Sequence, residues 1–404
     1  MVVKKASIIL GIVILVVTGV FANNNQWHLG VGFKEIDDAY YGSLSFRPDI
    51  SIGKLGLGLS LTLNFNEDGI RLEDWQEDGK FDLGKTTARI VRYASWGSLR
   101  DPIYIRVGEL NYVVVANGLI MDGYRNLTSE EIKADIRRLG VEVGVDAGYL
   151  GAHVMVNNAL KPEVYAVYPY LRPLYGLEKL PSFIKNTSVG LIYVQDSRPE
   201  YLMSHAYGVD VTVPLLNFLS LYGQAAELAN EARGYSLGAK AHMGPLVLRG
   251  EYRDFGENFK PSVYDWQYED LGTELVFLDE KTSGIMAEAG ISLLRDSLAF
   301  KLKYENMIRP NRETIPTLTG TAIIGPEFFT AIIGRKGQVE ATYTQTNYVV
   351  LNDLTNSRTK VDAKISLEMY RGLFGSYVYN ITYKPDGTPV RFQGFEISLG
   401  GAFN

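Results

Sequence analysis

The chain has 404 residues, 46% of them apolar and 21% charged, with a net charge of −6 and no cysteine. Because the charges are spread along the chain without a basic block, we expect no nucleic-acid partner, and the lack of cysteine excludes disulfides, thiol catalysis and cysteine-ligated metal. The 41 glycines and 26 tyrosines are typical of a folded, aromatic-rich β-protein.

The first residues have the three-part layout of a secretory signal. Lys4 and Lys5 precede an apolar run over residues 8–17, and the polar part of the chain starts after Ala22. We therefore predict a cleaved signal peptide at residues 1–22 and a single mature domain at residues 23–404. The alternative is an uncleaved anchor helix, since the apolar stretch is close to the length that a bilayer requires.

Strand-like segments follow along the N-terminal half. They lie near residues 26–33, 41–52, 55–65, 87–95, 103–109, 138–147 and 151–158, and about twelve more after residue 188 give a total of about 19. Because an antiparallel barrel normally needs an even number of strands, this total lacks one. The segment PEVYAVYPYL, residues 162–171, is the best candidate. It gives about 20 strands, within a range of roughly 16–20.

The C-terminal half alternates between apolar and polar residues. The segment TKVDAKISLEMY, residues 359–370, places on one face Val361, Ala363, Ile365, Leu367 and Met369. The residues between them are polar or charged, and similar segments of about 8–11 residues recur from residue 207 onward. A tilted strand needs about 9–11 residues to cross a bilayer. The apolar face is therefore predicted to contact lipid and the polar face a wet interior.

The connections alternate in length. Short turns are predicted at residues 244–245, 294–297, 335–337 and 371–372, and long polar loops at residues 257–282, 308–325 and 350–358. Short turns at one end and long loops at the other are typical of outer-membrane barrels. The predicted fold is all-β, a transmembrane up-and-down antiparallel β-barrel with an even number of strands.

The last segment, GFEISLGGAFN, alternates apolar residues and places Phe403 next to the final residue. With this ending the mature chain resembles the outer-membrane β-barrel proteins of double-membraned bacteria, of the porin-like kind. The resemblance implies export to the bacterial outer membrane, contact with outer-membrane lipid, passage of small hydrophilic solutes and a possible homotrimer.

Charged residues on the polar faces are candidates for lining a pore. The loop over residues 109–138 has helix-like content after Thr128 and falls where general porins have an inward-folded constriction loop, so it adds further candidates, among them Glu130, Glu131 and Lys133. The principal candidates are Lys240, Arg249, Glu251, Arg253, Lys301, Lys303, Glu305, Lys360, Asp362, Lys364, Asp122 and Arg125. The alternatives are that the charges only pair with one another across strands and that the loop lies outward in solvent.

The sequence gives little support for chemistry at a site. GYSLG, residues 234–238, matches a hydrolase nucleophile motif, but the alternation runs straight through Ser236, and His242 is about 20 Å away along a strand. The acidic stretch 64–82 begins like a calcium loop but has Trp75 where the bidentate glutamate belongs. We predict no catalytic residue, no metal site and no cofactor.

The expected function is a porin-like channel. The main alternative is a non-conducting barrel acting as adhesin, scaffold or membrane tether, and an outer-membrane hydrolase is the third possibility.

Overall fold

The computed structural model describes residues 26–402 except residues 37–38, 68, 72–74, 78–79, 82–88, 100, 129–130, 132–136, 230, 274, 276–278, 294–296, 311–315, 347–358, 371–372 and 384–387. The predicted signal peptide, residues 1–22, the loop predicted at 350–358 and the turn predicted at 371–372 lie outside the described residues, as does Phe403. Within the described residues, no helix has the length and apolar character needed to span a membrane.

The first half of the chain forms mainly strands. They are β1 (Gln26–Ile36), β2 (Ala39–Ile52), β3 (Leu55–Leu59), β4 (Leu61–Asn66), β5 (Gly69–Ile70), β6 (Gln76–Glu77), β7 (Lys80–Phe81), β8 (Val91–Trp96), β9 (Ile103–Gly108), β10 (Val113–Val114), β11 (Asp122–Tyr124), β12 (Gly140–Asp146), β13 (Leu150–Val156) and β14 (Val164–Leu171), followed by helix α4 (Ser182–Lys185). Strand β14 confirms the strand inferred from the even-number rule at residues 162–171.

The second half continues the same pattern with longer strands. They are β15 (Ser188–Asp196), β16 (His205–Leu216), β17 (Leu219–Leu228), β18 (Arg233–Met243), β19 (Leu246–Phe255), β20 (Thr282–Leu293), β21 (Leu298–Ile308), β22 (Thr317–Ile324), β23 (Gly337–Thr346), β24 (Thr359–Tyr370), β25 (Leu373–Tyr383) and β26 (Pro389–Ala402), with helices α5 (Tyr268–Leu271) and α6 (Pro326–Ile333).

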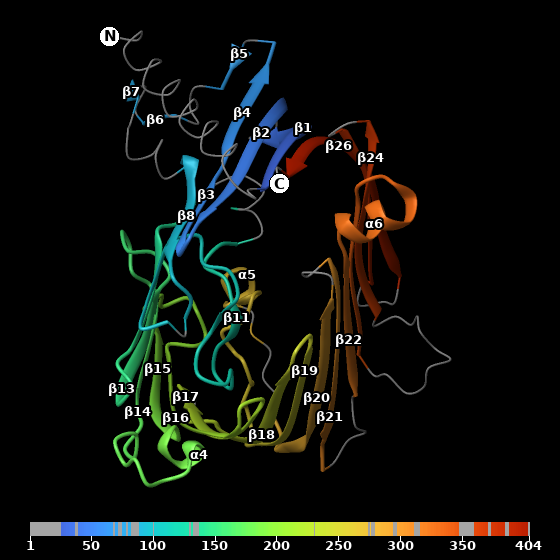
Figure 1. Ribbon diagram of the computed structural model, residues 1–404. Coiled ribbons are helices and arrows are strands. Elements are labelled where there is room, and N and C mark those ends of the chain that lie inside the picture. Colours follow the sequence, from blue (N-terminus) through green and yellow to red (C-terminus); the bar gives the residue numbers. More distant parts are fainter. Residues whose placement is uncertain are drawn as a thin grey trace.

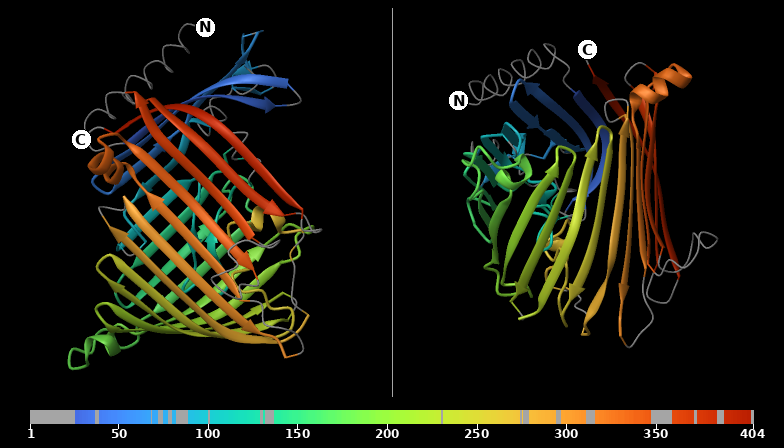
Figure 2. Two further views of the ribbon diagram at one scale, coloured as in Figure 1. Left: turned by 90° about the vertical axis from the view of Figure 1, so that its right-hand side faces the viewer. Right: turned by 60° about the horizontal axis from the view of Figure 1, so that its bottom comes forward.

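The strands form a barrel in which sequence neighbours pair antiparallel (Figures 1 and 2). β3 and β4 both pair with β2, β8 follows β3, and β9 pairs with β12. β26 pairs back on β1 from Gln26 opposite Ala402 to Val31 opposite Ile397. The described part of the sheet has 22 strands. If two-residue β5 is left out and β3 and β4 are counted as one strand, the barrel wall has 20 strands. This even number agrees with the predicted all-β, up-and-down antiparallel fold.

One predicted loop is wrong. Residues 308–325 contain strand β22, and α6 precedes the turn expected at residues 335–337. The inner positions of β22 are Thr317, Thr319 and Thr321, opposite the charged inner residues of β21. Because these inner positions hold threonines, which are uncharged, β22 does not show the alternation of apolar and charged residues that is seen in neighbouring strands.

The two ends of the barrel differ. Tight turns at residues 53–54, 217–218 and 244–245 share one end with α4 and α6, here called the short-turn end, and the longer connections 109–139 and 256–281 lie at the other, the long-loop end. Gly53 and Gly244 have φ of 60° and 59°. This left-handed conformation suits tight hairpin turns and favours glycine.

The outer face of the barrel is apolar. On β18, Leu237 is 67% exposed, while its neighbour Ser236 is buried. Exposed large apolar side chains recur at alternate positions of neighbouring strands, for instance at Val209, Tyr252 and Leu302. Alternation along each strand therefore separates an apolar outer surface from a polar inner one.

Inner-facing tyrosines fit against glycines of the adjacent strand. A Cβ atom on Gly238 would lie 2.5 Å from the ring of Tyr222, and one on Gly190 would lie 2.3 Å from the ring of Tyr168. The Tyr222 hydroxyl donates to Glu251 at 2.5 Å, and that of Tyr168 to Asp210 at 2.9 Å. Because glycine has no side chain, each tyrosine ring can lie flat against the wall, where its hydroxyl donates a hydrogen bond to a carboxylate.

Candidate functional site

The described part of the connection from β9 to β12, residues 109–139 without 129–130 and 132–136, folds into the barrel, where Figure 1 shows β11. The amide of Leu119 donates to Oε1 of Gln224 at 3.1 Å. Nδ2 of Asn117 donates to Oδ2 of Asp210 at 2.7 Å. Gln224 and Asp210 face inward and are paired in register on β17 and β16. The predicted inward course of this loop is confirmed, and the outward alternative is wrong.

A second connection, residues 256–281, packs onto the first. The amide of Ser262 donates to the carbonyl of Leu119 at 2.8 Å, and that of Tyr264 to the carbonyl of Ile120 at 3.1 Å. We call the described parts of these two connections the inner-loop pair. From the sequence, residues 257–282 are predicted only to be a long polar loop. The apolar residues Phe259 and Val263 within it were the available signal that it is buried.

The main apolar core lies between the inner-loop pair and the barrel wall. From the loops it includes Leu110, Ile120, Met121, Tyr264 and Tyr268, each at most 1% exposed. From the wall it includes small and branched inner residues of β14 to β17, such as Ala166, Val194, Ala206 and Ala226. Full burial of one large apolar side chain contributes about 1.5–3 kcal/mol, so several together hold the loops against this side of the barrel.

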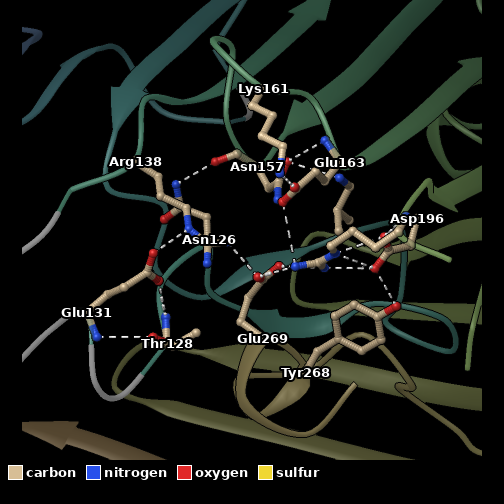
Figure 3. A network of polar contacts seen from close by, with 12 residues as sticks. Asn126, Thr128, Glu131, Arg138, Asn157, Lys161, Glu163, Asp196, Tyr268 and Glu269 are labelled. Atoms are coloured by element: carbon tan, nitrogen blue, oxygen red, sulfur yellow. Dashed lines mark hydrogen bonds and ion pairs between the residues drawn. The ribbon is translucent and has the colours of Figure 1, made fainter. Parts of the chain in front are cut away.

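A buried ionic cluster joins the loops to β15 (Figure 3). The Arg198 guanidinium lies between two carboxylates, with Nη2 2.7 Å from Oδ2 of Asp196 and Nη1 2.8 Å from Oε2 of Glu269. Glu269, on α5, also accepts hydrogen bonds from Nη1 of Arg138 at 2.6 Å and from the hydroxyl of Tyr124 at 2.5 Å. The cluster thus contains groups from both inner loops, from β15 and from the connection that follows it.

The charge state of Glu269 follows from this geometry. Burial alone would raise the pKa of its carboxyl, but the adjacent guanidinium groups of Arg198 and Arg138 outweigh burial and hold the pKa below its ordinary value. Tyr268 completes the arrangement by donating from its hydroxyl to Oδ2 of Asp196 at 2.8 Å. Charged partners with further hydrogen bonds are the condition under which a buried ion pair persists.

A second group of charges lies on the inner face of β19 and β21. Glu251 sits between two arginines, with Oε1 2.5 Å from Nη2 of Arg249 and Oε2 2.6 Å from Nη2 of Arg253. Arg253 also contacts Glu305, and Nζ of Lys303 lies 3.0 Å from Oε2 of Glu305. We call these five residues the wall charge row. Positive and negative groups alternate along it, so each charge is compensated by a neighbour.

The wall charge row meets the first inner loop. Nη2 of Arg249 donates to the carbonyl of Asn117 at 2.6 Å, and its Nη1 lies 3.4 Å from Oδ2 of Asp122. Further along β21, Nζ of Lys301 contacts Oε2 of Glu288 at 2.9 Å and the hydroxyl of Tyr112 at 3.4 Å. The loop therefore spans from the wall of β16 and β17 to that of β19 and β21.

The remaining predicted pore-lining residues lie outside the wall charge row. Arg125 forms an ion pair with Asp270 of the second loop, at 2.5 Å between Nη2 and Oδ2. Lys240 pairs in register with Arg249, Lys364 pairs in register with Glu340, and Nζ of Lys360 lies 3.8 Å from Oδ2 of Asp362. Of these, Lys240 and Arg249 carry like charges and Lys360 and Asp362 lie on the same strand. Charge pairing across strands, the alternative reading, occurs between Lys301 and Glu288 and between Arg253 and Glu305. That they line a pore stays a prediction.

The residues that would form the predicted helix after Thr128, 129–130 and 132–136, lie outside the described residues, but the contacts between Thr128 and Glu131 are described. The amide of Glu131 donates to Oγ1 of Thr128 at 3.0 Å, and the amide of Thr128 donates to Oε2 of Glu131 at 2.8 Å. This reciprocal pair has the pattern of a capping box. Glu130 and Lys133 lie outside the described residues.

The hydrolase motif lacks its required setting. Ser236 is a buried inner residue within β18, so no turn from strand to helix presents it. Nε2 of His153 contacts Oε1 of Glu142 at 2.9 Å, and Nδ1 of His205 contacts Oγ of Ser204 at 3.1 Å. Neither of these contacts brings a serine and an acid together on one histidine.

No protein-family model matches the chain, and no curated protein sequence matches it. Solved structures similar to it include OccK3 (OpdO) of Pseudomonas aeruginosa, 9% identical over 94% of each chain with a TM-score of 0.39, and the outer membrane protein OpdK of the same organism, 10% identical over 94% of this chain and 98% of that chain with a TM-score of 0.35. Another is Wzi of Escherichia coli, described as an outer membrane protein involved in group 1 capsule assembly and a carbohydrate-binding β-barrel, 10% identical over 98% of this chain and 87% of that chain with a TM-score of 0.34. The described strands of the chain form an all-β antiparallel barrel, and the similar solved structures include proteins described as outer membrane proteins.

Proposed function

We propose that the protein is a porin-like channel of the bacterial outer membrane through which small hydrophilic solutes diffuse passively. The observation that carries this proposal is the opposite chemistry of the two faces of the same strands. On β19, Leu248 and Tyr252 are exposed on the outer face, while Arg249, Glu251 and Arg253 form ion pairs on the inner face.

The outer face favours a lipid environment. An apolar surface of this extent is rare on a protein surrounded by water, and a hydrocarbon environment requires a structure whose backbone groups are all paired internally. The antiparallel pairing that runs round the barrel and returns from β26 to β1 joins the backbone groups of neighbouring strands in this way. Export through a cleaved signal peptide at residues 1–22 remains a prediction of the sequence, and a homotrimer remains only what the resemblance to porins implies.

The inner face suits hydrated solutes. The wall charge row balances arginine and lysine against glutamate, and the inner positions of β22 are threonines that pair with Thr342 and Thr344 on β23. Such a surface has no strong preference for anionic or for cationic solutes. We therefore expect the channel to admit small polar solutes of either charge, with the solute limit set by the inner-loop pair.

In this proposal the inner-loop pair forms the constriction of the channel. It occupies the side of β14 to β19, and its contacts through Tyr112 to Lys301 and through Asp122 to Arg249 reach toward β21. The path of solutes would run between this pair and the inner face of β20 to β25. Of the predicted pore residues, Lys301, Lys303, Lys360, Asp362 and Lys364 belong to that face.

A second function is favoured by one observation. The inner-loop pair has an apolar core of its own against the wall, which is the arrangement expected of a plug. A barrel blocked in this way would act as an adhesin, scaffold or membrane tether through its external loops.

Single-channel recording separates the two functions. The mature chain would be refolded into a planar bilayer after heat-dependent gel mobility has shown that it is folded. Stepwise openings whose conductance rises with salt concentration are expected of the channel. Folded protein that inserts without conducting would overturn the channel and leave the plugged barrel.

A further inference from the structure

Helix α6 (Pro326–Ile333) joins β22 to β23 at the short-turn end. Pro326 occupies its first turn, and the helix ends at Gly334, whose φ is 67° and whose amide donates to the carbonyl of Thr330 at 3.1 Å. Proline near the start and a left-handed glycine at the end are the usual signals of a defined helix. Its sequence, PEFFTAII, is almost wholly apolar, yet none of its residues is buried.

The helix lies on the outer side of the barrel wall. Gly337, the first residue of β23, pairs in register with Leu367, whose side chain is exposed on the outer face. A Cβ atom on Gly337 would lie 2.8 Å from the ring of Phe329. The ring of Phe329 therefore covers the outer face of β23 where that strand begins. Figure 2 shows α6 at the same end of the barrel as the end of β26.

The C-terminal part of the helix is largely uncovered by the described part of the chain. Ile332 is 65% exposed and Ile333 is 50% exposed, and Arg335, which follows the helix, is also exposed. The next residue, Lys336, adds a second positive charge at the helix C-terminus. An exposed apolar surface that continues an apolar barrel face and ends in cations matches the boundary between hydrocarbon and phospholipid headgroups.

We propose that α6 lies in the interfacial layer of the membrane leaflet at the short-turn end, with Ile332 and Ile333 among acyl chains and with Arg335 and Lys336 at the phosphate level. The proposal rests on the proposed membrane function. Its partner is the phospholipid of that leaflet, because short turns face the periplasm in outer-membrane barrels and α6 extends the lipid-facing surface at that edge. In this position the helix would fix the depth of the barrel in the bilayer.

The absence of cysteine allows a clean test, since a single introduced cysteine carries the only spin label. The variants are Ile332→Cys on α6, Leu302→Cys at an outer position of β21, and Lys161→Cys, whose side chain is 79% exposed at the long-loop end. Each is folded into phosphatidylethanolamine and phosphatidylglycerol vesicles, and the collision rates of the label with oxygen and with a water-soluble nickel chelate are measured.

A label at Ile332 is expected to collide more with oxygen than with the nickel chelate, as a label at Leu302 does, but at a shallower depth. If Ile332 matches Lys161 while Leu302 is lipid-exposed, the interfacial position of α6 is wrong and the membrane barrel stands. If Leu302 also matches Lys161, the membrane function itself fails. Spin–spin broadening at Ile332 would show a second copy on the helix and overturn the lipid contact. Ile333→Cys repeats the measurement if the first variant does not fold.

Discussion

Arg198 and Glu269, 71 residues apart in the sequence, meet inside the barrel with Nη1 of the arginine 2.8 Å from Oε2 of the glutamate. The arginine follows β15, and the glutamate belongs to the inward-folded connection between β19 and β20. A pair of this kind, with both side chains almost fully buried, is costly to break from one side only, because the remaining charge stays buried without its partner.

Glu269→Gln should loosen the second inner loop. Removing one partner of a buried pair costs about 3–5 kcal/mol, and here two arginines, Arg198 and Arg138, would lose a shared carboxylate. Limited proteolysis of the folded variant should cut within residues 256–281 faster than in the unchanged protein. Glu257→Gln, at an exposed position of the same loop, is the matched control. Equal cleavage rates for all three proteins would contradict this role of the cluster.

The docking of this loop should weaken at acid pH. Because the pKa of Glu269 is below its ordinary value of 4.5 in the folded state, its contribution is complete above about pH 4.5 and is lost as pH falls through the lowered value. Burial raises the pKa of Asp265 in the same loop, so protonation of Asp265 acts in the opposite direction. Hydrogen exchange of α5 amides should rise below pH 4.5 in the unchanged protein and lose this dependence in Glu269→Gln. An unchanged pH profile in that variant would point to another carboxylate.

Gly238→Val should destabilise the barrel wall. A Cβ atom at this position would overlap the ring of Tyr222, and moving that ring would break its hydrogen bonds with Glu251 and Arg249. Overpacking of this kind costs about 1–3 kcal/mol. The control is Gly250→Val on the neighbouring strand, where nothing lies within 4 Å of an added Cβ. The urea midpoint, followed by heat-dependent gel mobility, should fall for the first variant and hold for the second.

Ile120→Asp should enlarge the channel. Ile120 belongs to the first inner loop, and its side chain is 1% exposed in the core between that loop and the wall. A carboxylate there would be buried without a partner unless the loop left the wall. Single-channel conductance should rise, with more frequent switching between levels. Asn111→Ala, at an exposed position of the same loop, should leave conductance unchanged. An unaltered conductance in folded Ile120→Asp would mean that this loop does not limit the pore.

Replacing Lys301 and Lys303 together with glutamine should shift ion selectivity toward cations. Lys301 compensates Glu288, and Lys303 compensates Glu305 with Arg253, so their loss leaves excess negative charge on the inner wall. The reversal potential in a salt gradient measures this shift. Lys161→Gln, outside the proposed path, is the control. A double variant that conducts with unchanged selectivity would place the solute path elsewhere.

Much of the barrel could be predicted from the sequence because alternation along a strand is a local property. Successive side chains point to opposite faces whatever the rest of the chain does, so the apolar and charged faces of β19 and β24 can be read directly. Strand β14 was inferred in another way, from the even number of strands that an antiparallel barrel needs. Alternation did not reveal β22, where threonine replaces the charged residues that mark an inner face.

The candidate site was only partly predictable. The charges of the wall charge row follow from strand parity, but the partners of Arg198, Arg138 and Glu269 come from segments that meet only when the barrel has formed. Likewise, nothing local distinguishes a loop that folds inward, such as residues 256–281, from one that extends into solvent. Covalent geometry and side-chain pattern thus determined the faces of the strands, whereas the contents of the interior were decided by the tertiary structure, because burial inside a barrel depends on contacts between residues far apart in the chain.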